Sequence, residues 1–252
     1  MYILAVETTG PECSVALIDE NGNTFSECSG DVMSHLENLI PMTEQLLTEN
    51  GIKKSEISAV AASIGPGSFT GIRIGVTTAR TLSQALAVPA VSVPTLDSFR
   101  MKCDGTSLVV PVFNARRGQV YGAVFDENGE DILKPCPCML TDVFKSLKRY
   151  SGNMKCSSVT FYGDGIDAYE TEIDQFADEN SCFVIVKADK PERYQNAVPV
   201  AELALRKYRK GEMVTYEELL PDYMRITEAE QKLRDGTLAK ERAAKMAKFR
   251  SR

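Results

Sequence analysis

The chain has 252 residues, of which 43% are hydrophobic and 25% charged, as in globular proteins with a sizeable core. These values exclude collagen-like, disordered and disulfide-scaffold classes, and no apolar run approaches the roughly 20 residues of a membrane span. Residues 1–7 predict a first strand rather than a signal peptide, because no basic stretch precedes the apolar run. We therefore expect a cytoplasmic protein without a membrane partner.

Seven cysteines and one histidine restrict the chemistry that the chain can perform. The cysteine count is odd, and Cys136 and Cys138 are too close for the usual zinc spacing, so reduced thiols are expected. With His35 as the single histidine, histidine-based triads and paired-histidine metal motifs cannot be built within this chain. We expect no metal site.

The net charge of −6 is unevenly distributed along the chain. Residues 239–252 hold six basic residues and one acidic residue, a charge of +5, which leaves −11 for the preceding 238 residues. An acidic body argues against a nucleic-acid groove in the body itself. The basic end is either a solvated helix end or an electrostatic arm for a polyanion.

Strand and helix signals alternate through the first hundred residues. They predict strands at 3–6, 14–18 and 57–64, with helices at 34–50 and 72–87. A hairpin turn is expected at residues 19–22, with sequence DENG. Gly51 is a plausible helix C-cap, and Pro41 is expected to kink the helix around it.

The same order returns 107 residues later, without a gap. Strands are expected at 109–113 and 120–125, and the tetrapeptide DENG recurs at residues 126–129. A helix at 141–150 and a strand at 158–162 follow, and both halves then continue into a Gly-x-Gly turn. Each half therefore runs strand, strand, a third strand, helix, strand, Gly-x-Gly and helix.

Two such α/β halves predict the duplicated, two-lobe, actin-like fold of the ribonuclease H-like (ASKHA) type. We expect a first lobe over residues 1–100, a second over 101–225 whose last helix packs on either lobe, and a basic extension over 226–252. In this fold, turns facing the cleft hold nucleotide phosphates. The residues predicted to face a nucleotide are Glu7, Thr8, Thr9, Gly10, Asn114, Arg116, Gly163 and Gly165. The alternative, that these glycines only serve tight turns, has similar weight.

The segment GPGSFTG at residues 65–71 is the most distinctive in the chain. It lacks the Lys-Ser/Thr pair of a P-loop and the spacing of a dinucleotide-binding loop, and it is expected to turn a strand into a helix capped by Ser68 or Thr70. On that helix Gly71 and Gly75 belong to a stripe of small residues that lets another helix approach closely. That neighbour is either the helix at 34–50 or a second subunit, in which case Gly75→Leu would block association by overpacking.

Residues on these two helices are predicted to form an interface for a homodimer and for a partner protein. They are Leu36, Leu39, Ile40, Leu47, Gly71, Ile72, Arg73, Gly75, Val76 and Arg80.

The sequence contains few candidate catalytic side chains. Glu7 ends the first strand, where actin-like kinases present an aspartate, and its counterpart in the second half is the uncharged Asn114. Phosphoryl transfer needs positioned groups and a divalent ion. A phosphotransferase resembling acetate or sugar kinases stays open as an alternative, and so does a peptidase.

Five segments together resemble the TsaB (YeaZ) family over about the first 225 residues. They are ETT at 7–9, SHLENLIP at 34–41, GPGSFTGIRIG at 65–75, NARRGQVY at 114–121 and PDYMR at 221–225. The resemblance implies a cytoplasmic, non-catalytic partner of TsaD in the complex that forms N6-threonylcarbamoyladenosine at position 37 of tRNAs reading ANN codons. It also implies a TsaE-like ATPase in that complex, tRNA bound through the complex, and ATP or ADP there but no cofactor in the isolated chain. Relatives also carry the older label of glycoprotease, peptidase M22.

TsaD-like relatives carry a His-x-x-x-His metal-ligand pair after the strand that matches residues 88–93. Thr95 and Phe99 stand at those positions here, which removes the metal from both the peptidase and the transferase interpretations. Family members more often have Asp at 7, Asp at 114 and Glu at 119, so Glu7, Asn114 and Gln119 weaken a magnesium–phosphate site in this cleft.

Overall fold

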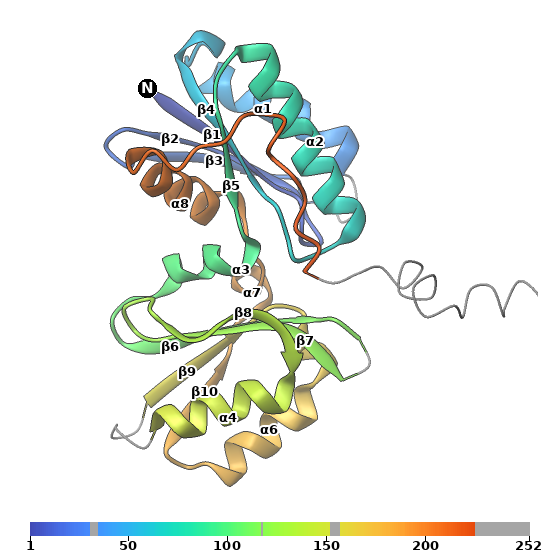
Figure 1. Ribbon diagram of the computed structural model, residues 1–252, viewed down its shortest axis with the longest axis vertical. Helices are drawn as coiled ribbons and strands as arrows, with labels where there is room; N and C mark the ends of the chain where they lie inside the picture. Colours follow the sequence, from blue (N-terminus) through green and yellow to red (C-terminus); the bar gives the residue numbers. More distant parts are fainter. Residues whose placement is uncertain (31–34, 117, 152–156, 225–252) are drawn as a thin grey trace, which may run out of the picture.

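The computed structural model describes residues 1–30, 35–116, 118–151 and 157–224. Its chain forms two five-stranded sheets, one above the other in Figure 1, each covered by helices. Predicted features at Ser34, Arg117, Cys156 and Arg225, together with the basic extension over 226–252, lie outside the described residues.

The first sheet has the strand order β3-β2-β1-β4-β5. Its strands are β1 (Tyr2–Glu7), β2 (Ser14–Asp19), β3 (Thr24–Cys28), β4 (Ile57–Ser63) and β5 (Ala90–Val93). β1 pairs with β2 antiparallel and with β4 in parallel. Both central strands, β1 and β4, are mostly apolar and buried on both faces, as parallel strands covered by helices are.

Helices cover both faces of this sheet. α1 (His35–Glu49) and α2 (Phe69–Leu86) contribute Leu39, Val76 and their neighbours to the core on one face. The other face is covered by α8 (Ala197–Arg209), which follows the second sheet in sequence and returns to the first. Residues 211–224 stay with the same lobe, since Val214 forms a β-bridge with Ala90 at the sheet edge.

The second sheet repeats the first. Its order is β10-β9-β6-β7-β8, built from β6 (Ser107–Asn114), β7 (Gln119–Phe125), β8 (Asp131–Met139), β9 (Ser157–Tyr162) and β10 (Phe183–Lys187). β6 stands where β1 stands in the first sheet, with an antiparallel hairpin on one side and parallel strands on the other. The duplicated two-lobe fold is therefore confirmed.

Helices of the second lobe lie mainly on the face away from the first lobe (Figure 1). α4 (Leu140–Ser151) and α6 (Glu170–Glu179) pack there, and the short α5 (Gly165–Ala168) precedes α6. α3 (Thr95–Ser98) and a 3-10 turn, Phe99–Lys102, cover the opposite face next to the first lobe. α7 (Lys190–Arg193) leads the chain back to α8.

Two further findings concern membrane-spanning helices and the cysteines. None of the helices in the described part of the chain is both long and apolar enough to cross a bilayer. All six cysteines within the described residues are free, and burial raises the pKa of Cys103 to about 11 and that of Cys138 to about 12.

Candidate functional site

Glu7 ends β1 and is fully buried beneath the space between the lobes. Its Oε1 accepts hydrogen bonds from the Thr9 backbone N–H at 2.5 Å and the Thr9 hydroxyl at 2.6 Å, while the Ser63 hydroxyl donates to Oε2. Burial raises the pKa of the Glu7 carboxyl, and these three donors oppose the rise. Because both its oxygens accept hydrogen bonds within the lobe, Glu7 anchors the β1–β2 turn, and it is not among the residues that line the cavity described below.

The GPGSFTG segment forms the turn from β4 into α2, as predicted, and Ser68 is the N-cap, its hydroxyl accepting the Gly71 N–H at 3.2 Å. The glycines let this turn lie directly on the β1–β2 turn. A Cβ on Gly71 would stand 1.9 Å from the Thr8 carbonyl oxygen, and one on Gly75 would stand 2.2 Å from Thr8 Oγ1. The two glycines therefore lie against a turn of the same lobe, whereas other residues of α2 share a core cluster with α1.

The ten residues predicted for an interface divide by exposure. Six are buried within the lobe and offer no surface to a second chain: Leu39, Leu47, Gly71, Ile72, Gly75 and Val76. Their apolar spacing reflects the core of the first lobe. Leu36, Ile40 and Arg73 are exposed, and Arg80 is half-buried, so these four keep a surface that a partner could contact.

Apolar and aromatic side chains are accessible where α1 and α2 begin. Leu36 is 75% exposed, and Ile40 and Phe69 are each 43% exposed. The Phe69 ring packs on Tyr223 at 4.8 Å between centroids, and the Arg73 guanidinium lies over the Phe69 ring. We call Leu36, Ile40, Phe69, Arg73 and Tyr223 the α1–α2 face. Sequence reasoning quoted Phe69 and Tyr223 in motifs but did not assign them to an interface.

A cavity of about 530 Å³ lies between the lobes. Four of the residues predicted to face a nucleotide line it: Thr9, Gly10, Asn114 and Arg116. Glu7 and Thr8 are buried beneath it, and Gly163 and Gly165 are not among its lining residues. The lining also includes Asp164, Tyr194 and Gln195, which the sequence did not single out.

Gly163 and Gly165 allow the turn after β9 to lie on β6. A Cβ on Gly163 would stand 2.3 Å from the Val112 carbonyl oxygen, and one on Gly165 would stand 2.7 Å from the same oxygen. The turn places Asp164 at the cavity, where its carboxylate accepts the Asn114 backbone N–H at 2.9 Å. The surrounding walls raise the pKa of the Asp164 carboxyl. These glycines thus serve close approach of backbone segments, the alternative left open above.

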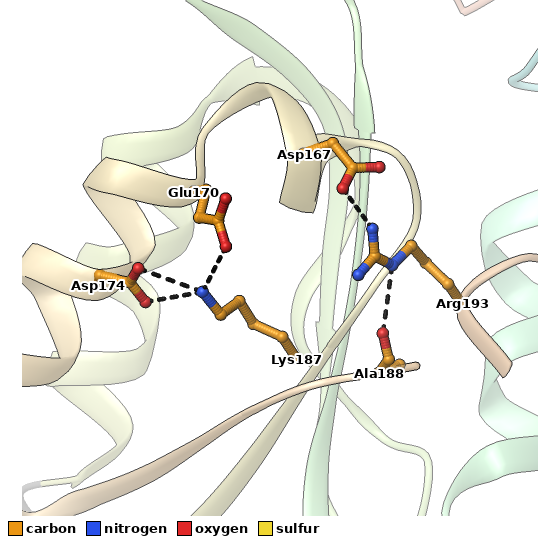
Figure 2. A network of polar contacts seen from close by, with 6 residues as sticks. All are labelled: Asp167, Glu170, Asp174, Lys187, Ala188 and Arg193. Carbon is orange, nitrogen blue, oxygen red and sulfur yellow. Dashed lines mark hydrogen bonds and ion pairs between the residues drawn. The ribbon is translucent and has the colours of Figure 1, made fainter. Parts of the chain in front are cut away.

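Ion pairs hold the segment that joins the second lobe to the first and contains Tyr194 and Gln195. Figure 2 shows Lys187 between Glu170 and Asp174, at 3.0 and 2.9 Å. It also shows Arg193, which binds the Asp167 carboxylate at 2.5 Å and donates to the Ala188 carbonyl at 3.2 Å. The Gly163 backbone N–H donates to the Arg193 carbonyl, so the segment is fastened to the turn that bears Asp164.

Thr95 and Phe99, at the positions of the relatives' metal ligands, are built into the packing between the lobes. The Thr95 hydroxyl accepts the Gly65 N–H at 3.2 Å, and the Phe99 ring contacts Phe113 and Tyr162. Both side chains are almost fully buried.

We therefore expect purified protein to hold much less than one zinc or iron per chain, since Phe99 has no ligand atom and the single Thr95 hydroxyl is already hydrogen-bonded to Gly65. Elemental analysis by inductively coupled plasma mass spectrometry checks this. About one tightly bound transition metal per chain would contradict the assignment of these positions.

The fold and the cavity first define the class of protein. It is a duplicated, two-lobe α/β protein, and the acid at the end of β1 is hydrogen-bonded within the first lobe. The family model described as TsaD, tRNA N6-adenosine threonylcarbamoyltransferase, matches residues 32–233. The chain belongs to the family that this model describes and, within it, to the TsaB proteins.

The relatives and the solved structures agree. The Bacillus subtilis tRNA threonylcarbamoyladenosine biosynthesis protein TsaB is 31% identical over 92% of this chain and 97% of its own. The Escherichia coli protein of the same name is 36% identical over 54% of this chain and 63% of its own. The structure of YeaZ from Pseudomonas aeruginosa is 28% identical, with a TM-score of 0.69 over 88% of this chain and 99% of that one. The family resemblance seen in the sequence is thus confirmed.

Proposed function

We propose that this protein is a subunit of the complex that forms N6-threonylcarbamoyladenosine at position 37 of tRNAs reading ANN codons, where it binds and activates a TsaD-like catalytic subunit. The likeness to TsaB over nearly the whole length of both chains supports this role. The geometry supports a binding role rather than catalysis, because Glu7 is bound on both oxygens by groups of its own lobe. The observation that carries the proposal is the accessible α1–α2 face.

The α1–α2 face fits a protein partner for a physical reason. α1 follows β3, and α2 follows β4. Both strands run parallel to β1, so their carboxyl ends lie at the same end of the first sheet. Leu36, Ile40 and Phe69 therefore lie at the same end of the helix pair. Aromatic and arginine side chains surrounded by aliphatic groups are the usual centres of protein interfaces. We propose that this face forms a homodimer in the isolated protein and contacts the catalytic subunit in the complex.

The further partners are part of the same proposal. A TsaE-like ATPase completes the complex, tRNA binds through the assembled complex, ATP or ADP is held there rather than by the isolated chain, and the protein acts in the cytoplasm.

Co-purification tests the proposal. The protein is co-expressed with the TsaD-like protein of its own organism, and the eluate is analysed for a stoichiometric complex. We expect the catalytic subunit to be retained and to be lost when the α1–α2 face is altered. Failure of the two chains to associate at micromolar concentration would overturn the proposal.

An actin-like small-molecule phosphotransferase and an M22-type peptidase are the alternatives, and turnover distinguishes them. Multiple turnovers of ATP with a small-molecule acceptor, or of a peptide substrate, by the isolated chain would favour one of these instead.

The basic residues 239–252, which carry +5, are proposed to add non-specific affinity for tRNA to the complex. Truncation after Thr237 should flatten the slope of log affinity against log salt concentration, because phosphate contacts release counterions. Filter binding of tRNA by the complex across a salt series measures this. Unchanged affinity and slope would leave the tail as a solvated end.

A further inference from the structure

The cavity between the lobes has walls of aromatic rings on both sides. Phe69 comes from the first lobe, Phe113 and Tyr121 come from the second, and Tyr194 lies on the segment that joins them. Its volume, about 530 Å³, is that of an ordinary small-molecule site. The polar groups between these rings determine which ligand it can accept.

Several backbone N–H groups around this cavity are already bound within the protein. Five lining residues donate within the protein: Thr9 to Glu7, Ser68 to Thr9, Asn114 to Asp164, Ala115 to Gln119 and Arg116 to Asn114. A polyphosphate needs such donors free and also meets the Asp164 carboxylate, which repels it. The bonded donors and the Asp164 carboxylate therefore disfavour a nucleoside polyphosphate in this cavity.

Gln195 forms part of the cavity wall and is fixed by a bond to the first lobe. The Thr9 hydroxyl has a single hydrogen and donates it to Glu7, so it must accept from the Gln195 amide nitrogen, which lies 2.5 Å away. This bond fixes the orientation of the amide. Gln195 is only 7% exposed, and its Oε1 has no hydrogen-bond partner. That oxygen is itself shielded from solvent, so Gln195 closes this part of the cavity wall and its Oε1 is not open to a ligand.

The charged groups on the cavity are one acid and one base. The Asp164 carboxylate is solvent-accessible, and the walls around it raise its pKa, so a nearby cation would be favourable. Arg116 is exposed on the same cavity and offers a partner to an anion. A ligand that carries both charges matches this pair.

We propose that the cavity between the lobes binds an α-amino acid or a molecule of the same zwitterionic form. Its ammonium group pairs with Asp164, its carboxylate pairs with Arg116, and its apolar side chain lies on the aromatic walls. This ligand site is independent of the proposed role as a subunit, and its test requires only the isolated chain.

Isothermal titration calorimetry with matched probes tests the site. The probes are L-leucine and L-phenylalanine, their analogues isocaproate and hydrocinnamate, which lack the ammonium group, and magnesium ATP. We expect at least one amino acid to bind and both carboxylates and ATP to bind at least on the order of tenfold more weakly. Equal or tighter binding of the carboxylates or ATP, or no binding of either amino acid at millimolar concentration, would overturn the proposal.

Two substitutions locate the site. Asp164→Asn keeps an oxygen for the Asn114 N–H but removes the charge, and should weaken amino-acid binding on the order of tenfold. Asp178→Asn is the matched control: it makes the same change at an exposed acid of α6 that does not line the cavity. It should leave affinity unchanged. Equal effects of the two variants, or none from Asp164→Asn, would place the ligand elsewhere.

Discussion

Gly71→Ala is expected to destabilise the protein by about 3 kcal/mol, although alanine ordinarily favours a helix by about 1 kcal/mol over glycine. The new Cβ would stand 1.9 Å from the Thr8 carbonyl oxygen, and that atom belongs to the backbone of the β1–β2 turn and cannot rotate away. Thermal unfolding should show a melting temperature lower by roughly 6–12 °C. Thr77→Ala, on the exposed side of the same helix, is the control and should change stability by less than about 0.5 kcal/mol.

A double-mutant cycle with Thr8 separates the two glycines. At Gly75 the obstructing atom is the Thr8 side-chain Oγ1, 2.2 Å from the added Cβ, with the Thr8 Cβ at an ordinary 3.5 Å. Thr8→Ala removes that oxygen and should recover about 1–2 kcal/mol of the loss caused by Gly75→Ala, after its own cost is subtracted. It should not rescue Gly71→Ala, because the Thr8 carbonyl remains. Equal coupling at both positions would contradict the packing described.

The glycine geometry also changes what Gly75→Leu would report. The sequence suggested that this variant blocks a second subunit, whereas the structure places the added side chain inside its own lobe. Loss of association in Gly75→Leu would therefore reflect misfolding, so the interface needs substitutions at exposed positions.

Leu36→Glu combined with Ile40→Glu is expected to weaken both self-association and binding of the TsaD-like subunit by a factor on the order of thirty, about 2 kcal/mol. A carboxylate placed in an apolar contact must be desolvated without a partner. Both side chains are accessible in the single chain, so its melting temperature should hardly change. Analytical ultracentrifugation measures the dimer, and surface plasmon resonance measures the complex.

Val184→Glu is the matched control for this pair. Val184 is 56% exposed on β10, the edge strand of the other lobe, and the substitution introduces the same charge. Wild-type association is expected. If Val184→Glu weakens binding as much as the α1–α2 pair does, the effect arises from net charge or from another surface, and the assigned face is wrong.

Much of the fold could be predicted from the sequence because its turns and strands have local sequence signals. The same signals also occur in both halves of the chain. The recurrence of DENG after two apolar strands, at an offset of 107, predicts the repeated hairpins that β2–β3 and β7–β8 form. The GPGSFTG turn and its Ser68 cap were predicted for the same reason, since glycine and serine act on their immediate neighbours.

The candidate site was less predictable because its contacts are remote in sequence. The small-residue stripe of α2 predicted a close neighbour, but periodicity cannot distinguish another helix from the turn at Thr8. The bond from Gln195 to Thr9 spans 186 residues and depends on α8 returning to the first sheet, which no local pattern encodes. The predicted interface combined core residues with surface residues, because both follow the same helical spacing. Leu39 is 1% exposed, whereas Leu36, on the same helix, is 75% exposed.

The most direct test of the central claim is an omission assay. Purified TsaD-like subunit, the TsaE-like ATPase and substrate tRNA are incubated with the threonylcarbamoyl donor, and N6-threonylcarbamoyladenosine is quantified by mass spectrometry of the digested tRNA. We predict product only when this protein is added, restored by Val184→Glu but not by the Leu36→Glu, Ile40→Glu variant. Equal product without this protein, or with the variant at matched concentration, would contradict the account.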